Sequence, residues 1–122
     1  MAEKLILPHH HQDTEREFEI IKHLPDENVI TTVAEAMKQL GDPSRLRIFW
    51  LLCHTEECVI NIAALTNMSS PAVSHHLRLL KATGLIVSRR EGKEMYYRAA
   101  DTHLVSKLHV TIEEIAEISC PT

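Results

Sequence analysis

Apolar residues recur every three or four positions over most of the chain, which is the spacing of one face of an α-helix. The pattern predicts a helix over residues 14–23, ended by Pro25, and a second from about residue 29 to Leu40, ended by Gly41. After a cap and turn at residues 42–44, positions 46–52 are almost wholly apolar. A helix of that kind is expected at the centre of a domain.

The second half of the chain predicts two short helices, a hairpin and a final helix. Residues 59–66 form the first helix, and residues 72–83 form the second, with Ser69 as its cap and Gly84 as its stop. Strand-like runs at 85–87 and 95–98 flank a glycine-containing turn. A helix-turn-helix followed by a hairpin is a winged helix, so we expect a mainly α fold with a small β-hairpin wing.

The last predicted helix runs from about residue 102 to 119. Its apolar positions form one stripe, which needs a partner surface: Leu104, Leu108, Ile112, Ile115 and Ala116. That partner is either the core of the same chain or another subunit.

Length and composition predict one domain after a short leader. The chain has 122 residues, 44% of them hydrophobic, which is enough for a single core. We expect residues 1–12 to be a mobile leader and residues 13–122 to be one domain, with the helix-turn-helix at 59–84 and the wing at 85–98. The leader carries His9, His10 and His11, whose imidazoles are either solvated or auxiliary metal ligands.

The chain has neither an apolar run long enough for a membrane span nor a secretion-type apolar segment at its start. The sequence therefore predicts a cytoplasmic protein with no membrane partner. No glycine-rich phosphate loop, serine elbow or HExxH pair is present. We expect no catalysis and no small-molecule substrate.

Charge is unevenly distributed, although the net charge is only −4. Residues 69–98 contain six basic and two acidic residues, a balance of +4, whereas both ends of the chain are acidic. In a helix-turn-helix the second helix enters the major groove and basic neighbours hold phosphates. The residues predicted to face double-stranded DNA are Ser69, Ser70, Ser74, His75, Arg78 and Lys81, with Arg89, Arg90 and Lys93 on the wing. The alternative is a winged helix used for protein contacts.

Three motifs in order carry a resemblance to a known family. They are LGDPSRLRI at 40–48, SPAVSHHLRLL at 70–80 and REGKEMYY at 90–97. In these motifs the chain resembles the ArsR/SmtB family of metal-responsive repressors, over about residues 29–118. The resemblance implies a homodimer, paired through the terminal helices, that sits on operator DNA and leaves it when an inducer binds.

The resemblance also implies a sensing site on the terminal segment 101–119. Zinc and cobalt sensors of the family have Asp-x-His at the start of the last helix, matched by Asp101 and His103, and later ligands at the positions of Glu114 and Glu117. His103 and Glu114 share a helix face but lie about 16 Å apart along it, too far for one ion. If the helices pair antiparallel, each site joins Asp101 and His103 to Glu114 and Glu117 of the partner subunit.

The ligand set favours zinc without fixing the metal. Glu114 stands where the family's zinc sensors commonly have His, so cobalt, nickel and manganese stay open. The alternative is that both glutamates are surface carboxylates and that Asp101 only caps the helix. His109 is a spare ligand nearby or, in the simpler interpretation, an ordinary polar position.

Three cysteines leave a second kind of sensor open. The family's soft-metal site uses Cys-Val-Cys, and here Cys58 is retained while Ile60 replaces the second cysteine. Cys53 reads as a small buried hydrophobe, and Cys120 lies near the C-terminus. A thiol-, persulfide- or soft-metal-responsive repressor using Cys53, Cys58 or Cys120 is therefore the alternative hypothesis.

Overall fold

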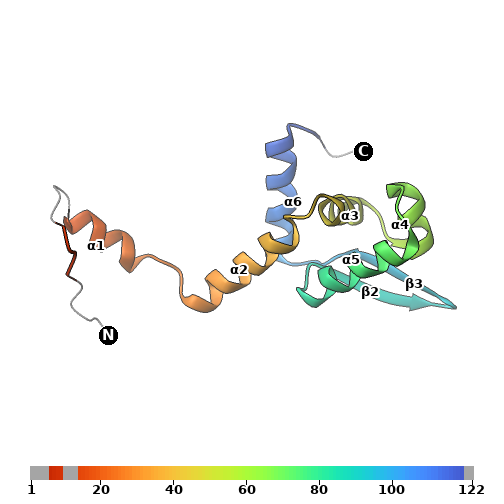
Figure 1. The fold of residues 1–122 in the computed structure, drawn as a ribbon, viewed down its shortest axis with the longest axis horizontal. Coiled ribbons are helices and arrows are strands. Elements are labelled where there is room, and N and C mark those ends of the chain that lie inside the picture. The colour runs from red at the N-terminus through yellow and green to blue at the C-terminus, as the bar shows by residue number, and fades with distance from the viewer. Residues whose placement is uncertain (1–5, 10–13, 120–122) are drawn as a thin grey trace. The chain divides into compact units, whose positions relative to one another are not determined.

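The computed structural model describes residues 6–9 and 14–119, in two compact units, Met1–Thr31 and Thr32–Thr122. The first unit contains α1 (Thr14–Lys22), and α2 (Glu27–Gln39) begins in the first unit and ends in the second. The remaining elements belong to the second unit (Figure 1): α3 (Pro43–His54), β1 (Glu57–Cys58), α4 (Val59–Thr66), α5 (Ser70–Ala82), β2 (Ile86–Glu91), β3 (Glu94–Ala99) and α6 (His103–Ala116). His10 and His11 of the predicted leader lie outside the described residues.

Helix α3 lies at the centre of the second unit. Asp42 caps it, since its Oδ2 accepts a hydrogen bond of 2.9 Å from the Arg45 amide, and this bond holds the pKa of Asp42 below its ordinary value. Pro43 occupies the first turn, where its missing N–H costs nothing. Ile48 and Phe49 are fully buried. The helix packs against α4, α5 and β3, as its apolar sequence predicted.

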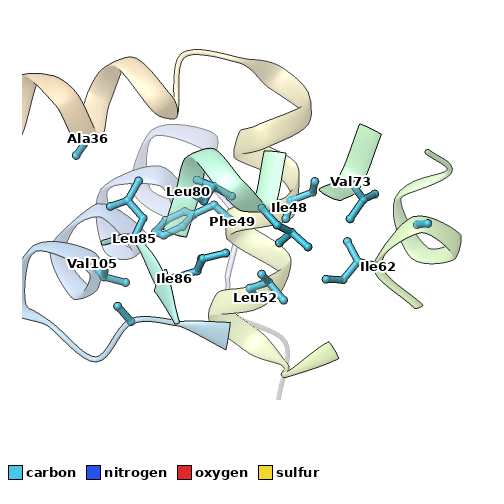
Figure 2. Packing of buried hydrophobic residues seen from close by; sticks show 13 residues of the cluster. Ala36, Ile48, Phe49, Leu52, Ile62, Val73, Leu80, Leu85, Ile86 and Val105 are labelled. Atoms are coloured by element: carbon cyan, nitrogen blue, oxygen red, sulfur yellow. The ribbon is translucent and has the colours of Figure 1, made fainter. Parts of the chain in front are cut away.

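Figure 2 shows the buried core, to which nearly every element of the second unit contributes. Its members are Ala36, Ile48, Phe49, Leu52, Ile62, Ala63, Val73, Leu77, Leu80, Leu85, Ile86, Ala100 and Val105. Phe49 of α3 lies among side chains of α5 and β2 in this view. The position of α5 is therefore set by its packing on α3 and β2.

Helices α4 and α5 form the predicted helix-turn-helix. Asn67 takes the left-handed conformation at the end of α4, with φ of 57°, which is tolerated by asparagine better than by most residues. Ser69 then caps α5, and its Oγ accepts a hydrogen bond from the Ala72 amide. Val73, Leu77 and Leu80 face the core, so the opposite side of α5 is exposed.

The wing is a three-stranded antiparallel sheet in the order β1-β3-β2. Strands β2 and β3 join through a two-residue turn at Gly92 and Lys93, where Gly92 has φ of 64°. A glycine with positive φ at the first turn position suits the twist of a hairpin. Both strands are longer than predicted, and the short β1, which pairs Glu57 with Tyr97, was not predicted at all.

Helix α6 is shorter than its sequence pattern predicted. Thr102 is its cap and accepts from the Val105 amide, so the alternative role of Asp101 as the cap is wrong. The helix ends at Ala116, because Glu117 adopts the left-handed conformation, and the prediction that it extends to residue 119 is wrong. Its apolar stripe is divided between two surfaces: Leu104, Leu108 and Ile112 pack on the core, whereas Ile115 is 79% exposed.

Among the described residues, none of the helices has the length and apolar character needed to cross a membrane.

The core predicts a contrast between two leucines of the helix-turn-helix. Leu80 is fully buried and Leu65 is 61% exposed. Leu80→Ala should lower the free energy of unfolding by about 2–5 kcal/mol because it leaves a cavity, and Leu65→Ala should change it by less than about 1 kcal/mol. Urea unfolding followed by circular dichroism measures both, and equal losses would contradict this packing.

Candidate functional site

The exposed face of α5 carries the side chains predicted to contact DNA. Ser70, Ser74, His75, Arg78 and Lys81 are all exposed. Arg78 and His75, one helical turn apart, are joined by a contact of 3.0 Å between Nη2 and Nδ1. The face is therefore polar and cationic, with hydrogen-bond donors pointing away from the core.

A hydrogen bond connects this face to the wing. Lys81 Nζ donates to Ser88 Oγ of β2 at 2.7 Å. The bond fixes the last turn of α5 relative to the strand that leads to the wing tip. At that tip, Arg90 and Lys93 are exposed.

Arg89 is placed differently from the other two wing cations. Its guanidinium donates two hydrogen bonds to Glu56 Oε1 and one to Oε2, at 2.8–3.1 Å, and it also pairs with Glu91. These carboxylates raise the pKa of Arg89, and Arg89 in turn lowers the pKa of Glu56. The side chain also lies over the Tyr96 ring, at 5.0 Å from its centroid. Arg89 thus fastens the wing to the segment that precedes β1.

His76 lies beside the reading face and is partly buried. Burial lowers its pKa, and Arg45 and His75 lower it further, while Asp42 opposes the change. Its Nδ1 is buried and has no hydrogen-bond partner among the described residues. Burial therefore disfavours the charged form of His76 beside this face.

The four predicted metal ligands are not gathered within one subunit. Asp101, His103, Glu114 and Glu117 are all exposed. His103 and Glu114 are eleven residues apart and lie on the same side of α6. Glu117 comes after the helix, in the left-handed conformation, so its side chain does not continue the helical face as expected.

The structure instead gathers two histidines and a glutamate that the sequence did not single out as a set. His54 is the last residue of α3, while His109 and Glu113 lie one turn apart on α6. Their ligand-type atoms lie within 4.8 Å of one another. His54 Nε2 is 3.1 Å from Glu113 Oε2, and His109 Nε2 is 3.0 Å from both of those atoms. Glu113 is buried, and both histidines are half-buried.

Trp50 completes the surroundings of this cluster. Its indole Nε1 donates a hydrogen bond of 3.0 Å to Glu113 Oε2. The Trp50 ring also packs against His54, with ring centroids 4.4 Å apart. The cluster therefore joins α3 to α6 through residues 50 and 54 on one helix and 109 and 113 on the other.

A surface hollow of about 410 Å³ lies next to the cluster. Its lining includes Cys53, Asp101 and His109. Cys53 is half-buried rather than fully buried, and Cys58 is buried at the start of α4; both are thiols that form no disulfide among the described residues. Cys120 lies outside the described residues.

Sequence reasoning could not assemble the cluster, because its members are far apart in the chain. His54 and His109 are separated by 55 positions. The only local signal was the i, i+4 spacing of His109 and Glu113, which is a common metal-ligand spacing on helices. The sequence left His109 as either a spare ligand for a different set or an ordinary polar position.

A helix-turn-helix with a cationic outer face and a wing defines the class of winged-helix regulatory proteins. Comparison with known proteins supports this class. Residues 42–88 match the bacterial regulatory protein, arsR family. The cadmium resistance transcriptional regulatory protein CadC homolog of Staphylococcus aureus is 40% identical over 90 residues, covering 70% of this chain and 74% of that protein. The chain belongs to the arsR family, which consists of transcriptional regulators rather than enzymes.

Two further relatives support the same assignment. The transcriptional repressor SmtB homolog of Synechocystis is 39% identical over 85 residues, covering 70% of this chain; the aligned region spans 64% of that relative's length. The homodimeric winged helix-turn-helix DNA-binding domain of a Mycobacterium bovis protein, solved in solution, is 34% identical with a TM-score of 0.67. The match covers 78% of this chain and 89% of that domain.

The exposed face of α5 predicts how removal of one positive charge changes the affinity for DNA and its salt dependence. Arg78→Ala should weaken binding to the DNA upstream of the gene and reduce the salt slope of log K by about 1 for each subunit, since one phosphate contact is lost. Lys107→Ala instead removes an exposed charge from α6, and it should leave the salt slope unchanged. Fluorescence anisotropy across a salt series measures this, and equal effects of the two variants would contradict the assigned face.

Proposed function

We propose that the protein is a transcriptional repressor that binds double-stranded operator DNA as a homodimer and is released when a divalent transition metal binds. The observation that carries the proposal is the exposed, cationic face of α5. Ser69 caps this helix, and a hydrogen bond from Lys81 to Ser88 joins it to the wing. A helix presented in this way enters the major groove, where polar side chains meet base edges. Arg90 and Lys93 at the wing tip supply phosphate contacts.

The homodimer forms through α6. The outer side of this helix and the residues after it expose Val110, Ile115 and Ile118, at 48%, 79% and 47%. Large apolar side chains exposed on and just after a terminal helix are typical of a subunit interface. The similar Mycobacterium bovis domain is homodimeric, which supports a homodimer here.

The sensing site joins two subunits. Asp101 and His103 of one subunit meet Glu114 and Glu117 of the partner subunit, giving two equivalent sites per dimer. The exposure of all four side chains and the shared side of His103 and Glu114 are compatible with this pairing. Imidazole and carboxylate ligands suit zinc best, with cobalt, nickel and manganese as further candidates. Metal binding would then shift the α5 helices of the two subunits away from the separation that the operator requires.

A thiol- or soft-metal-responsive repressor is the alternative. Cys53 has the most suitable position of the two described cysteines, because it lines the hollow beside His109. This alternative shares the DNA-binding half of the proposal and differs only in the inducer.

The deciding experiment is fluorescence anisotropy of the reduced protein on operator DNA, titrated with zinc, cobalt, nickel and manganese. One metal near stoichiometric concentration should release the parent, and Glu114→Ala combined with Glu117→Ala should raise the metal concentration required at least about tenfold. The variant should keep its affinity for DNA, because neither residue lies on α5 or the wing.

A matched control removes two exposed acids from α1, with Glu15→Ala and Glu19→Ala. It should respond to metal as the parent does. If every metal leaves the complex intact while a persulfide or disulfide reagent releases it, the thiol alternative is correct. If the protein does not bind the operator at any salt concentration, the repressor function itself is wrong.

A further inference from the structure

We propose that each subunit binds one divalent transition metal ion of its own, held by His54, His109 and Glu113. The site shares no residue with the inter-subunit set Asp101, His103, Glu114 and Glu117. It is complete within one chain, because all three ligands come from α3 and α6 of the same subunit. The inference therefore stands whether or not the inter-subunit site is used.

The three ligand atoms already have the spacing that a small metal ion requires. His54 Nε2, His109 Nε2 and Glu113 Oε2 form a nearly equilateral triangle with sides of 3.0, 3.0 and 3.1 Å. Ligands about 2.05 Å from a tetrahedral zinc ion lie about 3.3 Å apart. Each atom needs to move outward by only a few tenths of an ångström to form one face of that tetrahedron.

The chemistry of the three atoms points to the same ligand. Two imidazole nitrogens and one carboxylate oxygen are the donors that zinc, cobalt and nickel accept together. Without an ion, the contact between the two Nε2 atoms requires a proton between them, while both nitrogens also face Glu113 Oε2. A single divalent cation at the centre interacts favourably with all three atoms at once.

Trp50 orients the carboxylate. Its Nε1 donates to the same Glu113 oxygen that would bind the ion, and metal-bound carboxylates are commonly hydrogen-bonded in this way. Glu113 is only 8% exposed, so its carboxyl group is largely removed from water. A buried carboxylate is costly unless it is paired with a cation or hydrogen-bonded.

The adjoining hollow would give a fourth ligand a route to the ion. His109 lines this space of about 410 Å³, which opens to the surface between the end of α3 and the start of α6. Water reaching the ion from this side would complete a tetrahedron with three protein ligands.

The two metal sites would use different sides of α6. At about 100° per residue, His109 and Glu113 lie within about 40° of each other, and His103 and Glu114 lie within about 20°. The two pairs are about 100° apart around the helix. An ion in the intrachain site would brace α6 against α3, leaving the other side free for the partner subunit.

Trp50 is the only tryptophan of the chain, so it reports on this site directly. The experiment titrates Co²⁺ into protein carrying His9→Gln, His10→Gln and His11→Gln, which removes the imidazoles of the leader, and Glu114→Ala with Glu117→Ala, which removes two ligands of the inter-subunit site. Trp50 emission should be quenched with saturation at one Co²⁺ per chain, together with tetrahedral Co²⁺ absorption. Zn²⁺ should reverse both signals by displacing Co²⁺.

Variants separate this site from the inter-subunit one. His54→Gln and His109→Gln should each weaken the Co²⁺ quenching at least tenfold, whereas His103→Gln should leave it unchanged. Unchanged quenching in the first two variants, or its loss in His103→Gln, would overturn the proposal. Operator release by metal is scored separately, so failure of the proposed repressor function gives a different result.

A second measurement covers the case in which His54→Gln does not fold. In the parent with the same leader substitutions, nitrogen chemical shifts of the histidine rings are recorded by NMR before and after one equivalent of Zn²⁺. The Nε2 resonances of His54 and His109 should both move to the range of metal-bound imidazole. If these resonances keep their metal-free shifts while zinc is bound, the cluster is only a hydrogen-bonded contact between α3 and α6, and the proposal is wrong.

Discussion

The carboxylate of Glu113 is buried at the junction of α6 and α3, and its contacts determine how the terminal helix sits on the rest of the second unit. A buried carboxyl group in that position is stable only when its hydrogen-bond partners stay in place. Trp50 and His54 supply those partners from α3, and His109 supplies another from α6 itself. Around them, Leu104, Leu108 and Ile112 pack on the core. The polar cluster and the apolar contacts together define the orientation of α6.

Helix α3 also supports α5, whose exposed face is proposed to contact DNA. Phe49 and Ile48 are buried in the core that α3 shares with α5, and the wing is fastened by Arg89 to Glu56 just after α3 ends. The reading helix and the proposed sensing helix therefore pack on one element. In the proposed function, a change in the position of α6 reaches α5 through α3 rather than through the exposed loops. Coupling of this kind requires an element with two arrangements that both sites bias.

Sequence pattern predicted the order of the helices and the helix-turn-helix because each depends on local periodicity and on local stop and cap residues. Ser69, Gly84 and the apolar face of α5 are examples. The pattern did not predict β1, since two residues are too short for any alternation to show. It extended α6 too far, because a non-glycine residue, Glu117, takes the left-handed conformation that ends the helix. The His54, His109 and Glu113 cluster was missed because it depends on tertiary packing of segments 55 or more positions apart.

The most direct test of metal binding on α6 is anomalous X-ray diffraction from crystals of the zinc-loaded protein, recorded on both sides of the zinc absorption edge. We expect an anomalous peak about 2.0–2.2 Å from His54 Nε2, His109 Nε2 and Glu113 Oε2 in every subunit. A second peak is expected between Asp101 and His103 of one subunit and Glu114 and Glu117 of the partner subunit. Zinc found only elsewhere, with Glu113 still hydrogen-bonded to both histidines, would contradict metal sensing through this helix.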